Sequence, residues 1–152
     1  MNSKMKGRIL VVDDDDDLRE VFTLALESAG YEVCSAKFGR EAIEKSNNDH
    51  YHLALIDMRL PDMEGTQLLT AFNNSNPKMR KVIVTGYPSV SNTIEALNKQ
   101  ADGFLVKPVN IEDLLKEVAK QLKEREEEIS YSERKVEEFV LDRIREVRQE
   151  TK

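Results

Sequence analysis

Apolar residues occur along this chain in short unbroken runs that alternate with segments of helical periodicity. A short apolar run without polar alternation is typical of a strand buried on both faces of a parallel sheet. We expect such strands at 9–12, 31–36, 53–56, 81–85 and 103–107. Apolar residues then recur every three or four positions, which predicts helices near 18–29, 39–45, 66–72, around Ile94 and Leu97, and from 111 to about 122. This alternation predicts an α/β fold, a doubly wound parallel sheet of five strands with helices on both faces.

Turn and capping residues mark the ends of several of these elements. Gly30 stands where the C-cap of the first helix belongs, and Gly65 belongs to the loop after the third strand. Either Ser89 or Ser91 can cap the fourth helix. The segment 110–113 resembles a capping box and is expected to begin the last helix.

The first and third predicted strands end in carboxylates. Asp57 follows the third strand directly, and Asp13 and Asp14 follow the first. Ligands of open α/β sheets bind beyond the carboxyl ends of the strands, so we expect these side chains to converge. The acids at 15–17 have a simpler explanation, because acidic residues cap and stabilise the first turn of a helix. Asp13 and Asp14 precede that turn and are not explained in this way.

Thr85 and Lys107 end the fourth and fifth predicted strands and are expected at the same edge of the sheet. Three carboxylates packed together cannot all stay ionised without a cation, because like charges raise one another's pKa. Mg²⁺ prefers a few carboxylates, waters and phosphate oxygens as ligands. A hydroxyl group and an ammonium group suit the oxygens of a phosphoryl group. The pattern predicts a carboxylate nucleophile that accepts phosphate in the presence of a metal.

Composition narrows the classes of function. The chain has 152 residues and a net charge of -6, which argues against nucleic acid binding through a general basic face. Cys34 is the single cysteine, which excludes an internal disulfide, and we expect it in the core. His50 and His52 have no third ligand and are expected at the surface. No segment approaches transmembrane length and the first apolar run is too short for a signal peptide, so we expect a cytoplasmic protein.

Four motifs together resemble the receiver domain of response regulators in two-component signalling. They are VVDD at 11–14, IDMRLPDMEG at 56–65, VTG at 84–86 and FLVKP at 104–108. Their order and spacing extend the resemblance from residue 8 to about 123. The resemblance implies a flavodoxin-like form of the doubly wound fold. It also implies a phosphoprotein that acts as a phosphorylation-dependent switch and signals through protein contacts.

The resemblance also implies the roles of the acidic residues. By that resemblance Asp57 is the phosphoacceptor and contributes to the Mg²⁺ site. Asp14 is then the direct Mg²⁺ ligand, and Asp13 acts mainly through metal-bound water. The backbone carbonyl of Arg59 completes the protein ligands.

Further roles implied by the resemblance fall on the last two strands. Thr85 and Lys107 bind the phosphoryl group, and Phe104 turns inward when Thr85 is drawn to the phosphate. The bond between Lys107 and Pro108 is expected to be cis. Taken alone, Thr85 and Phe104 would be ordinary strand residues, and only the joint pattern favours these roles.

The implied partners are a sensor histidine kinase or phosphotransfer protein and a downstream target protein, with no direct DNA binding and no membrane insertion. A receiver is not a conventional enzyme, since it accepts phosphate from a kinase and autodephosphorylates. The alternative is an Mg²⁺-dependent phosphatase or phosphotransferase acting on a small molecule. The Asp-x-Asp-x-Thr motif of one such family is absent, because Asp17 stands where the threonine belongs. A constitutive scaffold with a relict site is disfavoured by the intact acid pair.

We expect a receiver domain over 8–123 and a charged, amphipathic helical extension over 124–152. Pairs of opposite charge at i,i+4 spacing favour a continuation of the last helix. Ser130 with Glu133 instead resembles a capping box that would begin a second helix, and both alternatives stay open. A row of apolar residues on the extension would be exposed to water on an isolated helix. We therefore expect this row to bind a partner, most simply a second copy of the chain. The row consists of Val136, Phe139, Val140, Ile144 and Val147.

Overall fold

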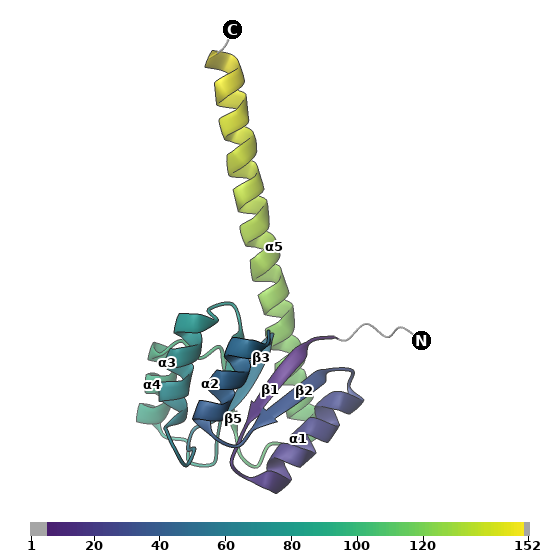
Figure 1. Cartoon of the computed structure of the whole chain (residues 1–152), viewed down its shortest axis with the longest axis vertical. Coiled ribbons are helices and arrows are strands. Elements are labelled where there is room, and N and C mark those ends of the chain that lie inside the picture. The colour runs from purple at the N-terminus through teal and green to yellow at the C-terminus, as the bar shows by residue number, and fades with distance from the viewer. Residues whose placement is uncertain (1–5, 151–152) are drawn as a thin grey trace. The chain divides into compact units, whose positions relative to one another are not determined.

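The computed structural model describes residues 6–150, and a parallel sheet of five strands forms its centre (Figure 1). The strands lie in the order β2-β1-β3-β4-β5. Their bounds are β1 Arg8–Val12, β2 Glu32–Ala36, β3 Leu53–Asp57, β4 Arg80–Thr85 and β5 Gly103–Val106. The strand order changes direction at β1 and β3, and sheets of this kind bind ligands at such a switch point.

Helices cover both faces of the sheet, which confirms the doubly wound α/β prediction (Figure 1). α1 and the first part of α5 pack on one face, and α2, α3 and α4 pack on the other. The helices are α1 Asp16–Ser28, α2 Gly39–Asn48, α3 Gly65–Ser75, α4 Val90–Asn98 and α5 Ile111–Glu150.

Successive residues of the central strands belong to two separate cores. In β1, Ile9 and Val11 pack with α1 and α5, whereas Leu10 and Val12 pack with the helices on the opposite face. All of them are buried. Each buried side chain of this size stabilises the fold by about 1.5–3 kcal/mol relative to an exposed one. Because both faces are covered, β1 and β3 carry no polar alternation, and this explains their unbroken apolar runs.

Capping residues lie at the ends of several helices, largely at the positions that the sequence indicates. Asp15 is the N-cap of α1, and its side chain accepts the backbone N–H groups of the first helical turn. Gly30 follows α1 with a φ of +100°, a backbone conformation that favours glycine. Ser89, rather than Ser91, caps α4. The side-chain oxygen of Asn110 accepts the N–H of Asp113 at 2.7 Å and so caps α5.

Two units make up the chain, Met1–Leu122 and Lys123–Lys152. The second unit is helical throughout its described residues, because α5 continues without interruption to Glu150. The alternative of a new helix beginning at Ser130 is therefore wrong. A mid-helix serine is tolerated at a small cost, and ion pairs one turn apart, such as Arg143 with Glu146 at 3.1 Å, support the continuous helix. Among residues 6–150, no helix is both long and apolar enough to cross a bilayer.

Candidate functional site

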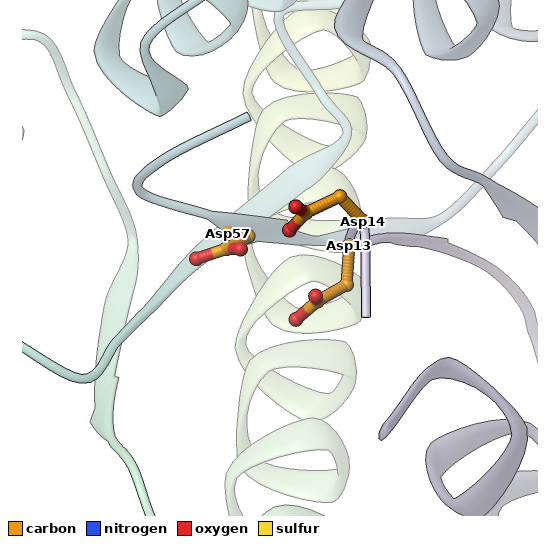
Figure 2. A group of neighbouring side chains, drawn as sticks. All are labelled: Asp13, Asp14 and Asp57. Carbon is orange, nitrogen blue, oxygen red and sulfur yellow. The ribbon is translucent and has the colours of Figure 1, made fainter. Parts of the chain in front are cut away.

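Three carboxylates meet at the carboxyl edge of the sheet (Figure 2). Asp13 and Asp14 follow β1 and Asp57 ends β3, and one oxygen from each lies within 4.8 Å of the others. The strands pair in register, with Val12 opposite Ile56, so the residues that follow are brought side by side. Asp13 and Asp57 are buried, whereas Asp14 is exposed.

Backbone contacts hold the two acidic strand ends in place. The N–H of Asp13 donates to the carbonyl of Ala36 in β2 at 3.1 Å. The N–H of Gly65 donates to the carbonyl of Met58 at 2.7 Å, so the start of α3 lies against the strand end. A Cβ atom at Gly65 would lie 2.5 Å from the carbonyl oxygen of Asp57. Only glycine permits this close approach beside the end of β3.

Lys107 reaches into the carboxylate cluster from the end of β5. Its Nζ atom lies 3.2 Å from Asp13 Oδ2 and 3.5 Å from Asp57 Oδ1. Its backbone N–H donates to the carbonyl of Thr85 at 2.7 Å, and the following bond to Pro108 is cis. Burial alone would lower the pKa of Lys107, but the Asp13 and Asp57 carboxylates raise it, so the ammonium group stays charged.

The pKa of the Asp57 carboxyl group lies well above its ordinary value. Burial raises the pKa of Asp57 to about 6, and the neighbouring Asp13 carboxylate adds to this effect. Lys107 and the N–H of Arg59, 3.4 Å from Asp57 Oδ1, oppose the shift only in part. A second cation, beside Lys107, would offset the repulsion between the Asp13 and Asp57 carboxylates. The site is therefore electrostatically suited to a metal ion.

The set of donors in the cluster fits a hard divalent cation. All three side chains of the cluster offer carboxylate oxygens, and Mg²⁺ binds a few carboxylates while keeping several waters. The exposed Asp14 leaves one side of the cluster open to solvent. The residues present therefore fit Mg²⁺, the ion indicated by the sequence.

Thr85 ends β4, which is the neighbour of β3, and Phe104 lies on β5, on the far side of β4. Thr85 is buried, and its Oγ1 accepts the N–H of Tyr87 at 3.1 Å, which leaves the hydroxyl proton available to another acceptor. Phe104 is half-buried and packs against the core beneath α2, α3 and α4. The strand register places Phe104 opposite Ile83, two residues before Thr85.

Arg59 and Tyr87 come from different loops and stack on one another. The guanidinium carbon of Arg59 lies 4.7 Å from the centre of the Tyr87 ring. Arg59 stands two residues after Asp57, and Tyr87 stands two residues after Thr85, so the stack joins the loops that flank the cluster. Both side chains remain exposed to solvent. Sequence spacing identifies these positions, but the contact between them is seen only in the structure.

The remaining candidates lie away from the cluster. His52 is half-buried at the start of β3, where its Nδ1 atom accepts the N–H of Arg8 at 2.9 Å. His50 is exposed, and its ring lies 5.1 Å from that of His52 in an edge-on arrangement. Cys34 is only half-buried and lies at the margin of one core. None of these residues contributes to the acidic edge.

Two residues that hold the loops around the cluster could not be identified from the sequence pattern. Asp62 accepts the N–H groups of Gly39 and Arg40 at 2.9 and 3.0 Å and so caps α2 from the loop after β3. Arg19 in α1 donates to the carbonyl oxygen of Asp13 at 2.8 Å. No local spacing indicates these contacts, because Asp62 lies more than twenty residues from its partners and the Arg19 contact depends on side-chain direction.

Such a sheet, with acids, a threonine and a lysine at its carboxyl edge, has the architecture of the receiver class of signalling domains. Residues 9–119 match the family model described as response regulator receiver domain, and the chain belongs to this family. Receiver domains are signalling switches of two-component systems rather than conventional enzymes, so the small-molecule phosphatase alternative is not favoured.

Relatives of known name or structure agree with this assignment. The chain is 33% identical over 120 residues to the response regulator receiver protein CpdR of Brucella abortus, covering 76% of this chain and 96% of CpdR. A CheY-like receiver domain structure from Methanospirillum hungatei is 45% identical, with a TM-score of 0.78 over 80% of this chain and 97% of that one. The transcriptional regulatory protein AlgB of Pseudomonas aeruginosa is 34% identical over 124 residues, or 82% of this chain. The chain spans 28% of AlgB and about a quarter of several other curated regulators.

Proposed function

We propose that Asp57 is the phosphoacceptor of this receiver and that phosphorylation requires Mg²⁺. The observation that carries the proposal is the position of Lys107, whose ammonium group lies between the Asp13 and Asp57 carboxylates. A carboxylate oxygen of Asp57 attacks the phosphorus atom, the bond to the leaving group of the donor breaks, and an acyl phosphate forms on the side chain. The donor keeps the electron pair of the broken bond.

The other residues of the edge bind the transferred group. Lys107 offers a compact positive charge to the phosphoryl oxygens, and the Thr85 hydroxyl offers a hydrogen bond. Asp14 and Asp57 would hold the Mg²⁺ directly, Asp13 would act mainly through water, and the Arg59 carbonyl would complete the protein ligands. When bound, the ion neutralises charge that otherwise repels an incoming phosphate.

Movement of Thr85 toward the phosphate would transmit the change to the surface. Thr85 would leave its present contact with the Tyr87 N–H, and the half-buried Phe104 ring would turn into the space behind it. The proposal rests on the register of β4 and β5, which places Phe104 two positions from the partner of Thr85 on the adjacent strand. The phosphate is expected to be lost later by hydrolysis within the same site.

Phosphorylation of Asp57 can be tested by intact-protein mass spectrometry with a small acyl phosphate or phosphoramidate donor. We expect one phosphate adduct in the presence of Mg²⁺ and none after chelation, because the acids repel the donor without a cation. Asp57→Asn should abolish the adduct. Asp17→Asn is the matched control, since it removes one exposed acid from the first turn of α1 and should leave phosphorylation intact. An undiminished adduct in Asp57→Asn would refute the assignment.

The partners proposed for the chain are those that a receiver requires. A sensor histidine kinase or phosphotransfer protein supplies the phosphoryl group, and a target protein binds the altered surface. We propose that the receiver acts in the cytoplasm through protein contacts and does not itself bind DNA. The acidic balance of the chain, with a net charge of -6, supports the absence of a DNA-binding face.

We propose that the extension over 124–152 joins two copies of the chain. Its apolar row is exposed in the single chain, with Phe139 exposed by 66% and Ile144 by 43%. Each such side chain would contribute about 1.5–3 kcal/mol if a partner buried it. The four-and-three spacing favours a helix-to-helix contact, although Arg125 and Ser132 interrupt the apolar spacing of the extension before this row begins.

Sedimentation of the full chain at tens of micromolar is expected to show a dimer. Phe139→Glu combined with Ile144→Glu should return it to a monomer, because burying two carboxylates at the contact is costly. Truncation after Leu122 should also give a monomer. Glu138→Gln with Asp142→Asn, on the opposite face of the helix, should leave the dimer intact. A monomeric full chain whose thermal stability is unaffected by the two glutamates would contradict the proposal.

A further inference from the structure

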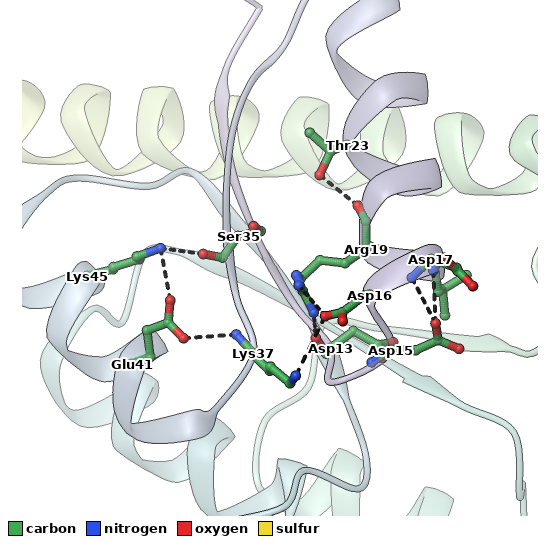
Figure 3. Close-up of polar contacts among 11 residues, drawn as sticks. Asp13, Asp15, Asp16, Asp17, Arg19, Thr23, Ser35, Lys37, Glu41 and Lys45 are labelled. Carbon is green, nitrogen blue, oxygen red and sulfur yellow. Dashed lines mark hydrogen bonds and ion pairs between the residues drawn. The ribbon is translucent and has the colours of Figure 1, made fainter.

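We propose that Arg19 is a positioning residue for the acidic loop and that Mg²⁺ binding depends on its guanidinium fork. The inference rests on the proposed Mg²⁺ site and adds a residue that does not touch the ion. Arg19 lies in the first turns of α1, with its side chain 19% exposed, and points back toward the loop that joins β1 to α1 (Figure 3).

The fork of Arg19 makes two hydrogen bonds to that loop. One nitrogen, Nη1, donates to the carbonyl oxygen of Asp13 at 2.8 Å, and the other, Nη2, donates to Asp16 Oδ1 at 2.7 Å. A planar guanidinium group makes both bonds at once with its two nitrogens, which a lysine ammonium cannot reproduce with the same geometry. The two bonds therefore fix the loop both at Asp13 and at the first residue of α1.

The contact matters because Asp13 is then held on both sides of its backbone. Its N–H donates to Ala36 in β2, and its carbonyl accepts from Arg19. The direction of its side chain follows from this, with Oδ1 accepting the N–H of Asp15 at 2.9 Å and Oδ2 lying 3.2 Å from Lys107 Nζ. Without the bond from Arg19, the carbonyl side of Asp13 would lose this restraint, and the remaining contacts would hold the carboxylate less precisely in the cluster.

A longer ion pair joins Asp16 to the residue that follows β2 and does not involve the Asp13 backbone. Asp16 lies between Arg19 and Lys37, whose Nζ atom is 3.8 Å from Asp16 Oδ1. The backbone N–H of Lys37 donates to the Glu41 carboxylate at 3.1 Å, which joins this group to α2 (Figure 3). Asp16 also places a negative charge beside the guanidinium group, which weakens the repulsion that Arg19 would exert on a cation.

A positioning role and a purely electrostatic role predict opposite changes in Mg²⁺ affinity when Arg19 is removed. If Arg19 acted only through its charge, removing it would tighten Mg²⁺ binding, because like charges repel. If it acts by holding Asp13, removing it weakens Mg²⁺ binding. Outer-shell partners of metal ligands are typically worth about 10–100-fold in affinity, so we expect a loss of about tenfold in Arg19→Gln.

The experiment measures Mg²⁺ affinity by isothermal titration calorimetry of the unphosphorylated protein, with the urea stability of each metal-free variant measured separately. Arg19→Lys keeps the charge and loses the fork, and it should lie between wild type and Arg19→Gln. Lys37→Gln is the matched control, because it removes one positive charge near the loop without touching the Asp13 backbone, and its affinity should be unchanged or slightly higher.

Each outcome separates this inference from the proposed function. A wild type that binds Mg²⁺ with an Arg19→Gln variant of equal or higher affinity would overturn the positioning role and leave the proposed site intact. An affinity lowered equally in Arg19→Gln and Lys37→Gln would also overturn it, since a general loosening of the loop, and not the bond from Arg19 to the Asp13 carbonyl, would then account for the loss. A wild type that binds no Mg²⁺ would overturn both proposals. Should Arg19→Gln not fold, the Mg²⁺ affinity of Arg19→Lys relative to that of the wild type decides the question in the same way.

Discussion

Replacing Asp57 with asparagine is expected to raise the free energy of unfolding of the metal-free protein by up to about 3 kcal/mol at pH 7.5. Asp57 is buried, and its pKa is raised to about 6 by that burial and by the Asp13 carboxylate. An ionised Asp57 is therefore unfavourable in the folded protein relative to the unfolded chain. Asparagine has nearly the same shape and removes this charge, so the penalty disappears.

The raised pKa of Asp57 also determines how the stability of the wild type changes with pH. The folded pKa of about 6 lies above the ordinary value of 3.8, so between these values the folded protein binds more protons than the unfolded chain. Stability of the wild type should consequently fall as pH rises from about 4 to about 6 through this group, and then stay level. The advantage of Asp57→Asn should grow over the same interval and be absent below about pH 4.

Urea unfolding at a series of pH values, in the presence of a chelator, measures this difference. Addition of Mg²⁺ should stabilise the wild type and reduce the advantage of the variant, because the cation removes the repulsion between the acids. Asp17→Asn serves as a control with the same chemical change at an exposed site. A destabilised Asp57→Asn at pH 7.5, or a difference from wild type that does not vary with pH, would contradict the charge argument.

Loss of the stack between Arg59 and Tyr87 is expected to shorten the lifetime of the phosphorylated protein by roughly tenfold. The guanidinium carbon of Arg59 lies 4.7 Å from the centre of the Tyr87 ring, beside the loops that follow Asp57 and Thr85. We expect the hydrolytic water to approach here, in line with the phosphorus atom. A cation–π contact is worth about 0.5–2 kcal/mol, and opening it before attack adds that amount to the barrier. The variant Arg59→Asn with Tyr87→Glu removes both halves of the stack.

Decay of the phosphorylated protein, followed by mass spectrometry after removal of the donor, tests this expectation. Tyr87→Phe is the informative control, because it keeps an aromatic face for Arg59 and should have a lifetime close to that of the wild type. Arg59→Lys keeps the charge with a poorer stack and should decay at an intermediate rate. A double variant that decays at the wild-type rate or more slowly would show that the exposed stack does not obstruct hydrolysis.

Much of the fold follows from local features of the sequence. The unbroken apolar runs at β1, β3 and β4 require burial on both faces, and only a sheet with helices on both sides supplies it. Parallel strands in register must also bring Asp13 and Asp57 to one edge, so the acidic cluster is predictable from the amino-acid sequence alone. Capping by Asp15, Ser89 and Asn110 is likewise predictable, because each side chain bonds within a few residues of itself.

The tertiary structure alone decided the contacts that join separate loops. Asp62 caps α2, Arg19 holds the Asp13 carbonyl, and Arg59 stacks on Tyr87, and each contact depends on side-chain directions that no spacing encodes. The raised pKa of Asp57 depends in the same way on how deeply the assembled strands and loops bury it. The choice between one helix and two was also open, because the sequence carries signals for both. The sequence by itself determined which residues reach the edge of the sheet, since strand register is periodic. Packing between distant segments determined how those residues are held there, because burial and long-range hydrogen bonds exist only once the chain has folded.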